Sequence, residues 1–482
     1  MQTVPTTREA ASPSVPTFAR APVFVIAALT ALAHLGFAIA GRGYWLDEVL
    51  MLAVGRHHLD WGSADQPPVV PLLAAAADAI APGSMVALRV PAILATAAAV
   101  VVAALLAREL GGDRRAQLIT AGAQATAAWL SFSGHWLTPY ALEPLQWLLI
   151  AWLLARWTNR RDDRLLLVLG VVVGIAIETK FQVLGLCAVL VLAVAVVGPR
   201  ELFRRPALWA GAVVAALVAA PTMIWQAVHG WPQLGMATVA ADEAQYLYGG
   251  RPGVAVLLVV IAGFPGTVLA VYGLVRFLRG PDLRPYRFLG VSALVLYVVF
   301  VVTEGRFYYL AGMLGVLIAA GAVGLQRRRE ARGAPRRVWP WFGIGIVVAA
   351  AALWVSGPSA DPATPERFTQ QAAEAYRSLP PEQREHTAVV GGSYIYASYL
   401  DAYSDEVGLP EAYSGNRSYG YFPPPSEDKD TVLYLGEQPE SLRPWFSDVR
   451  PVGEPGANLS LATGRTAPWS VISEQWRTLT VS

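Results

Sequence analysis

The chain has 482 residues, of which 55% are apolar and only 15% are charged, and its mean hydropathy is +0.42. Several uncharged apolar runs approach bilayer-spanning length, so the composition excludes an ordinary soluble domain and predicts a polytopic membrane protein. The net charge of +2 is too small to indicate nucleic-acid binding. The single cysteine, Cys187, lies in an apolar run, so no intrachain disulfide can form.

The first apolar segment runs from Val23 to Ala40. Its end, Ala38-Ile39-Ala40, resembles a signal-peptidase site, so a cleaved secretory signal is one interpretation. A polar segment of about twenty residues precedes it, and the apolar run is nearly long enough to span a bilayer. Both features favour an uncleaved membrane anchor.

A polar stretch, 42–85, separates this segment from the next apolar run, Val86 to Ala107. Carboxylates held just outside a bilayer are candidates for acid–base chemistry. Two alternatives stand beside this interpretation, because an Asp also caps helices and an Asp before Gln-Pro-Pro also suits a turn. The candidate residues of this stretch are Asp47, Glu48, His57, Asp65 and Gln66.

Arginines recur in clusters between the apolar runs, and the positive-inside rule places such clusters on the cytoplasmic side. The stretch between two neighbouring clusters must then cross the membrane and return. Five helical hairpins follow, with outer apices near 42–85, 133–142, 180, 227–252 and 303–307, and an eleventh helix from about 339 to 355. The clusters are Arg8 and Arg20; Arg108, Arg114 and Arg115; Arg156, Arg160, Arg161 and Arg164; Arg200, Arg204 and Arg205; Arg276, Arg279, Arg284 and Arg287; and Arg327 to Arg337.

This topology divides the chain into a cytoplasmic tail, 1–20, a helical membrane domain, 21–357, and an extracytoplasmic domain, 358–482. The last part is polar and rich in proline, and it reads as a small α/β domain. Residues 387–392 and 431–435 are typical of strands, and 394–403 of a helix. The expected location is the plasma (inner) membrane, with the N-terminus inside and the C-terminus outside.

The hairpin from Leu165 to Val197 is short for two crossings, because each arm has only about 16 residues, or roughly 24 Å of helix. Its apex should lie below the outer surface, and Lys180 stands there, one of two lysines in the chain. An ionisable residue at membrane depth indicates function. The alternative is a lysine that extends to the interface.

The other apices combine aromatic and ionisable side chains. Aromatic residues alone would fit an ordinary interfacial belt, and Glu143 would also suit a helix N-terminus. Acids, one lysine and one arginine nevertheless occur on the side of the membrane where the positive-inside bias leaves few cations. They could converge on one anionic ligand, and the residues concerned are Glu143, Lys180, Arg306, Tyr308 and Tyr309.

Short motifs occur in order along nearly the whole chain. They are Asp47-Glu48, Asp65-Gln66-Pro67-Pro68, Leu88-Arg89-Val90-Pro91, Ala141-Leu142-Glu143-Pro144-Leu145, Thr179-Lys180-Phe181, His229-Gly230-Trp231-Pro232, Phe307-Tyr308-Tyr309-Leu310-Ala311, Gly408-Leu409-Pro410 and Ser414-Gly415-Asn416. Together they resemble bacterial glycosyltransferase family 39, membrane enzymes of the GT-C superfamily related to protein O-mannosyltransferases and to the lipid A aminoarabinose transferase.

The resemblance implies transfer of a hexose or pentose, with inversion, from a polyprenyl-phosphate carrier to an acceptor of the cell envelope, a glycan, lipid or protein. It implies Asp47 as general base with Glu48 beside it, and Lys180, Arg306, Tyr308 and Tyr309 on the donor phosphate. Asp65, Gln66, Glu143 and His57 would form the substrate loop region. The sequence has Arg306 where many members have lysine, which keeps the charge.

Tyr140 stands where many members have Asp or Asn, which leaves acceptor or metal contacts there open. No cofactor follows from the resemblance, and a divalent metal stays an option. The sequence indicates a lipid-linked sugar donor, membrane lipid and an envelope acceptor as partners, and no nucleic acid. A transporter or flippase of lipid-linked sugars is the alternative, since such proteins also carry ionisable residues at membrane depth. A membrane scaffold without catalysis is a third class.

Overall fold

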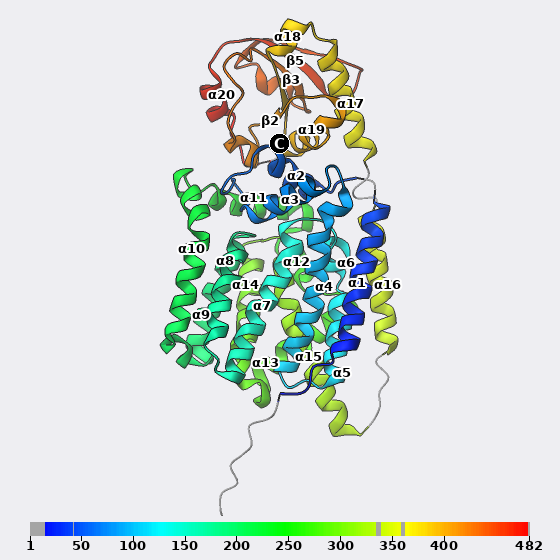
Figure 1. Cartoon of the computed structure of the whole chain (residues 1–482), viewed down its shortest axis with the longest axis vertical. Coiled ribbons are helices and arrows are strands. Elements are labelled where there is room, and N and C mark those ends of the chain that lie inside the picture. Colours follow the sequence, from blue (N-terminus) through cyan, green and yellow to red (C-terminus); the bar gives the residue numbers. More distant parts are fainter. Residues whose placement is uncertain (1–14, 42, 334–338, 358–361, 481–482) are drawn as a thin grey trace, which may run out of the picture.

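The computed structural model describes residues 15–41, 43–333, 339–357 and 362–480. Residues 1–14 of the predicted tail lie outside them, as do Arg8, Arg336 and Arg337 of the predicted arginine clusters. The described chain forms a long helical bundle with a separate α/β domain at one end (Figure 1). The predicted fold class, a helical membrane protein with a small C-terminal sheet domain, is confirmed.

The helices of the bundle follow the predicted order of crossings. By length and composition, α1, α4, α10 and the segment Pro281–Val302 can span a membrane, and α12 with α13 forms a further pair bent by 97°. The bundle consists of α1 (Arg20–Ala40), α4 (Met85–Glu109), α5 (Arg114–Ala125), α6 (Ala128–Ser133), α7 (Pro139–Arg160), α8 (Arg164–Ile177), α9 (Gln182–Val197), η1 (Arg200–Arg204), α10 (Pro206–Val228), α12 (Gly250–Val260), α13 (Gly263–Arg279), η2 (Pro281–Tyr286), α14 (Arg287–Val302), α15 (Ala311–Arg332) and α16 (Trp339–Ser356).

Local chemistry sets several of these boundaries. Ser84 caps α4 by accepting a hydrogen bond from the Ala87 N–H at 3.3 Å, and Asp113 caps α5 through the Ala116 N–H at 2.9 Å.

The backbones of α8 and α10 touch where Gly170 faces Gly211, since a Cβ on Gly170 would lie 2.2 Å from the Gly211 carbonyl oxygen. Small residues permit this close packing of membrane helices.

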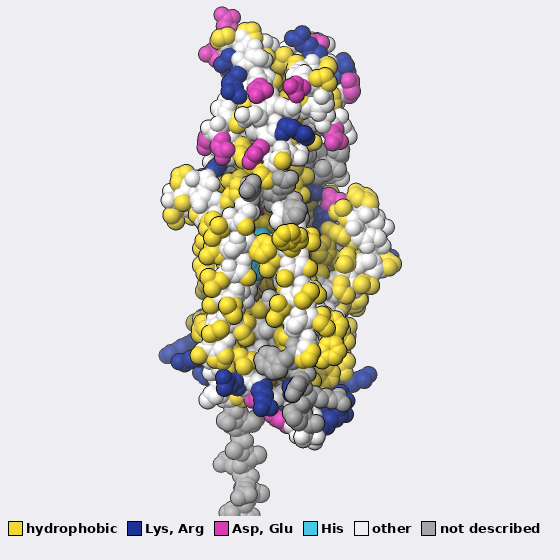
Figure 2. Space-filling model, turned by 90° about the vertical axis from the view of Figure 1, so that its right-hand side faces the viewer, with side chains coloured by type: hydrophobic (Ala, Val, Ile, Leu, Met, Phe, Trp, Pro, Cys, Tyr) yellow, Lys and Arg dark blue, Asp and Glu magenta, His cyan; other side chains and the backbone are white. Residues whose placement is uncertain are grey.

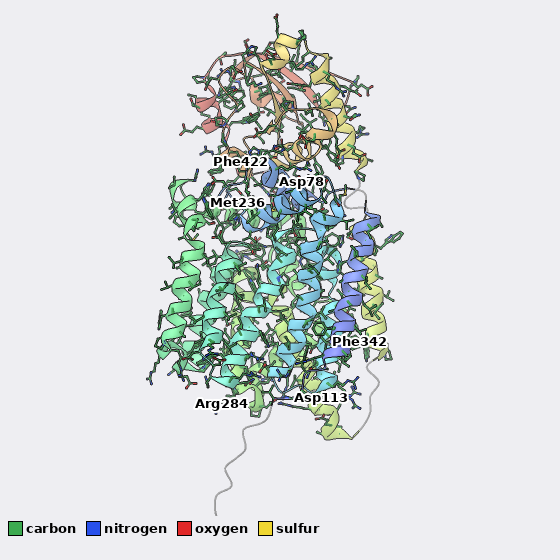
Figure 3. The ribbon with its side chains drawn as sticks, in the orientation of Figure 1. Asp78, Asp113, Met236, Arg284, Phe342 and Phe422 are labelled. Atoms are coloured by element: carbon green, nitrogen blue, oxygen red, sulfur yellow. The ribbon has the colours of Figure 1, made fainter. Side chains whose placement is uncertain are left out.

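Two predicted apices contain helices of their own. The first holds α2 (Leu46–His57) and α3 (Val69–Ile80), and the fourth holds α11 (Pro232–Tyr248). In Figure 1 these three helices form a layer between the bundle and the C-terminal domain. Figure 3 places Asp78 and Met236 near this layer, and Asp113 and Arg284 at the opposite end of the bundle.

The two ends of the bundle differ in their charged side chains. Figure 2 shows a broad hydrophobic band along the bundle, with Lys and Arg side chains gathered at the end far from the C-terminal domain. Lipid-facing side chains account for the band, because Leu192, Val196, Leu217 and Val298 are among many large apolar residues left exposed.

The C-terminal domain is built on a five-stranded mixed sheet in the order β2-β1-β3-β5-β4. The predicted strands and helix are present as β1, β3 and α19, and β1 pairs in parallel with both β2 and β3. Its elements are α17 (Ala363–Ser378), α18 (Pro381–Glu385), β1 (Thr387–Gly391), α19 (Tyr394–Val407), β2 (Ala412–Tyr413), η4 (Arg417–Tyr421), β3 (Thr431–Leu435), η5 (Pro439–Leu442), β4 (Phe446–Pro451), β5 (Leu459–Arg465) and α20 (Trp469–Trp476).

One hydrophobic cluster joins this domain to the layer below it. Leu50 and Leu52 of α2 and Val70 of α3 pack in the same buried cluster as Tyr399 and Leu400 of α19. Polar contacts reinforce it: the Tyr399 hydroxyl donates to the Tyr44 carbonyl at 2.9 Å. The domain therefore rests on the stretch that carries the predicted catalytic residues.

Candidate active site

Asp47 lies in the first turn of α2, on the layer between bundle and domain. The Tyr140 hydroxyl, at the start of α7, donates a hydrogen bond to its carboxylate. The same hydroxyl accepts the Trp45 indole N–H at 2.6 Å, and the Trp45 ring stacks on Trp136 with centroids 4.4 Å apart. Aromatic side chains thus hold the Tyr140 hydroxyl in place beside Asp47, a residue that is half-buried overall.

Burial raises the pKa of the Asp47 carboxyl above its ordinary value, against the hydrogen bond from Tyr140 and the charge of Arg417, which lower it. The neighbouring charge of Asp65 raises this pKa further, and that of Arg306 lowers it. A carboxylate with a raised pKa is a stronger proton acceptor, which is the property that a general base needs.

Glu48, the neighbour of Asp47, has different surroundings. Its carboxylate is fully buried and forms an ion pair with Arg89 of α4, with Oε2 2.8 Å from Nη2. It also accepts the Leu137 N–H at 3.2 Å. Glu48 therefore joins α2 to α4 and to the 134–138 turn.

The Lys180 loop, 178–181, is fixed between three elements. The Glu178 carbonyl accepts the Val69 N–H, at the start of α3, at 3.0 Å, and the Glu178 carboxylate accepts the Thr222 hydroxyl of α10 at 2.5 Å. On the other side the Gln146 amide donates to the Thr179 hydroxyl at 2.7 Å. The loop separates α8 from α9, as the short hairpin predicted.

Lys180 itself faces an aromatic cage. Its ammonium lies 4.8 Å from the ring centroid of Tyr308 and 4.9 Å from that of Tyr309, and it pairs with Glu143 Oε2 at 3.3 Å. The other Glu143 oxygen is buried and has no hydrogen-bond partner among the described residues. Cation–π contacts hold an ammonium in a defined position without neutralising its charge.

Arg306, next to this cage, pairs with Glu243 of α11. The other Glu243 oxygen accepts a bond from Arg417 Nη2 at 2.6 Å, and Arg417 belongs to the C-terminal domain. Asp47 lies within electrostatic range of Lys180, Arg306 and Arg417. The charges of three cations from distant parts of the chain thus act on one carboxylate.

The residues predicted in the stretch 42–85 do not all reach the candidate site. Asp65 accepts the Ser418 hydroxyl at 2.6 Å and the Gln66 amide at 3.1 Å, so both loop residues lie near the C-terminal domain. His57 is exposed at the far end of α2, about 15 Å from Asp47 by helical rise, and the structure does not bring it to the site. Its neighbour His58 is buried instead and stacks on Phe422, with centroids 4.2 Å apart.

An apolar cavity of about 710 Å³ lies among α7, α8, α9 and α10. Residues of α7, α8, α9 and α10 line it, among them Leu154, Ile177, Cys187 and Met223, and the lining consists of apolar side chains and glycine. Ile177 is the last residue of α8, three positions before Lys180. The cavity thus has the polarity of a lipid chain, and its lining includes the last residue before the Lys180 loop.

The sequence did not predict Glu243, Tyr394 and Arg417 as site residues. Only the tertiary fold brings them to Arg306 and to the other charged residues of the candidate site. The one signal was local, since Arg417 follows the Ser414-Gly415-Asn416 motif directly. Among the described residues, no group of three or more His, Cys, Asp or Glu side chains is placed to hold a metal ion.

Comparisons with known proteins agree with this architecture. Residues 65–225, which include Asp65, Glu143 and Lys180, match the family model of dolichyl-phosphate-mannose-protein mannosyltransferase. The sequence matches none of the curated proteins.

Two solved structures of ArnT from Cupriavidus metallidurans share the fold. The apo form gives a TM-score of 0.65 at 14% identity, covering 91% of this chain and 97% of that chain. The form bound to undecaprenyl phosphate gives 0.62 at 15% identity, covering 92% and 98%. The chain therefore has the fold of these structures, which is the fold that the GT-C resemblance predicted. Its long apolar helices are those of a membrane protein.

Proposed function

We propose that this protein is an inverting glycosyltransferase that moves a sugar from a polyprenyl-phosphate carrier to a cell-envelope acceptor outside the plasma membrane. One observation carries the proposal: Asp47, a carboxylate with a raised pKa, lies within electrostatic range of Lys180, and the Lys180 loop adjoins an apolar cavity. An acceptor hydroxyl, an anionic phosphate and a lipid chain would each meet suitable chemistry there.

The proposed reaction is a single displacement. The acceptor oxygen attacks the anomeric carbon while its proton passes to the Asp47 carboxylate, held by Tyr140. The bond between that carbon and the phosphate oxygen breaks, and the polyprenyl phosphate leaves with one additional negative charge. Lys180 and Arg306 stabilise this charge, because fixed cations in a site removed from water act where charge develops. Glu48 holds α2 in place through Arg89.

The orientation in the membrane belongs to the same proposal. Lys and Arg side chains gather at the end of the bundle far from the C-terminal domain, and such an end faces the cytoplasm by the positive-inside rule. The N-terminus would then be cytoplasmic, and the site and the C-terminal domain would face outward. A reporter active only outside the cytoplasm, fused after Ser482, should be active, and a silent reporter would contradict this topology.

The direct test is transfer by the purified protein. Incubation with a panel of polyprenyl-phosphate sugars should give sugar transfer or release for at least one donor, and Asp47→Asn should abolish it. The relative ArnT supports the choice of lipid, since one of its structures is described as bound to undecaprenyl phosphate. Transport of an intact lipid-linked sugar across vesicles, without bond cleavage, would overturn the proposal in favour of a flippase.

A further inference from the structure

The C-terminal domain reaches into the candidate active site through one side chain. Arg417 starts η4 and extends to Glu243, the residue that also pairs with Arg306. Glu243 therefore bridges two guanidinium groups, one from the bundle and one from the domain. A carboxylate between two guanidiniums has the charge and shape of a bound phosphate oxyanion, because both present two oxygens to a planar fork of N–H donors.

Several contacts fix the Arg417 side chain in this direction. Its guanidinium stacks on Tyr394, with the central carbon 4.6 Å from the ring centroid, and its Nε donates to the Leu479 carbonyl at 3.3 Å. The next residue, Ser418, donates to Asp65. The Ser63 and Ser418 hydroxyls lie 2.8 Å apart. The segment is thus tied to the same outer loop that carries Asp47.

The Arg417 backbone is strained. Its φ is +48°, in the left-handed region that residues other than glycine rarely adopt. Such conformations persist where the surroundings impose them, and they cluster at functional sites. A surface tie between two domains would not require this geometry, since an exposed arginine reaches a carboxylate from ordinary backbone conformations.

Arg417 also acts electrostatically on the reacting centre. Its charge is among the influences on the Asp47 carboxylate, with those of Asp65 and Arg306. Its side chain is buried, with 9% of its surface exposed. Arg417 therefore shares Glu243 with Arg306 and lies within electrostatic range of Asp47.

We propose that Arg417 is a donor-binding residue supplied by the C-terminal domain, and that it binds the polyprenyl-linked phosphate together with Arg306. The phosphate takes the place between the two guanidiniums that Glu243 occupies without donor. This inference rests on the proposed function and adds a ligand from a domain outside the bundle. It makes the C-terminal domain a part of the donor site.

The test is equilibrium binding of undecaprenyl phosphate to the full-length protein in nanodiscs, with the saturation level and the Kd measured separately. Arg417→Gln should raise the Kd by about tenfold or more, since a charge-assisted contact to phosphate is lost. Arg417→Lys should give an intermediate Kd, because lysine keeps the charge but lacks the planar fork. Arg450→Gln, which removes an exposed arginine of the same domain, is the matched control and should leave the Kd unchanged.

The saturation level separates folding from binding. A variant that only loosens the domain lowers the amount bound at saturation and leaves the Kd of the folded molecules unchanged, which overturns the inference. An unchanged Kd in Arg417→Gln overturns it as well. If that variant does not fold, a wild-type Kd in Arg417→Lys overturns it. If the wild-type protein binds no undecaprenyl phosphate, the proposed function fails first, and this inference falls with it.

Discussion

Replacement of Asp47 by asparagine isolates the proton-accepting oxygen of the candidate site. Asparagine has nearly the same shape, and its carbonyl oxygen can still accept the hydrogen bond that the Tyr140 hydroxyl donates. The cations proposed to bind the donor phosphate are untouched, and one negative charge near them is removed. We therefore expect donor binding to be unchanged or slightly tighter, while the chemical step loses its base.

General-base catalysis typically contributes about 10²–10⁴-fold, which corresponds to about 2.7–5.5 kcal/mol of activation free energy. Asp47→Asn should therefore lower kcat by at least about 100-fold in a transfer assay with saturating donor. In the wild-type protein, transfer should fall as the pH falls through the Asp47 pKa, and the midpoint should lie above the usual 3.8 because burial raises that pKa.

The same substitution makes a second, independent measurement available. A carboxyl whose pKa is raised in the folded state destabilises the fold at a pH where it is ionised. Asp47→Asn should therefore keep or increase the thermal stability at neutral pH while it removes activity. Near-wild-type turnover in a well-folded Asp47→Asn protein would refute the assignment of the base.

Three further predictions concern charge pairs. Glu48→Gln should lower folded yield, because an uncompensated Arg89 charge costs about 3–5 kcal/mol, and adding Arg89→Met should restore yield. Lys180→Ala should weaken donor affinity about tenfold or more at normal yield, and unchanged affinity would leave Lys180 as an interfacial residue. The hydrogen bond from Arg56 lowers the pKa of the Asp78 carboxyl, so the ionised carboxylate stabilises the folded state. The Tm of the wild-type protein should therefore exceed that of Asp78→Asn above pH 3.8, and the difference should vanish as the pH falls through the lowered pKa and the carboxylate is protonated.

The helical part of this protein could be predicted from the sequence because membrane spans are local. A run of apolar residues of about 20 positions is stable across a bilayer by itself, and arginine clusters mark its ends. The short hairpin from Leu165 to Val197 even predicted the loop at Lys180, since two arms of such length leave few residues for a connection. In the C-terminal domain, runs of β-branched and apolar residues likewise predicted β1 and β3.

The roles of neighbouring residues could not be read in the same way. Asp47 and Glu48 are adjacent acids with the same apparent environment, and their different surroundings arise from what packs against each face of α2. Arg89 and the 134–138 turn occupy Glu48, whereas the Tyr140 hydroxyl meets Asp47. His57 and His58 differ for the same reason, since one is exposed and the other is buried against Phe422.

The sequence alone determined the membrane class, the order of the helices, and a set of polar residues that gather at the end of the bundle next to the C-terminal domain. It determined them because hydropathy and charge act over short stretches of chain. Only the tertiary structure decided that Glu243 would bridge Arg306 and Arg417, residues more than 100 positions apart. These side chains meet because the C-terminal domain packs on α2 and α3. No local sequence pattern predicts the distance between two side chains that are far apart in the chain.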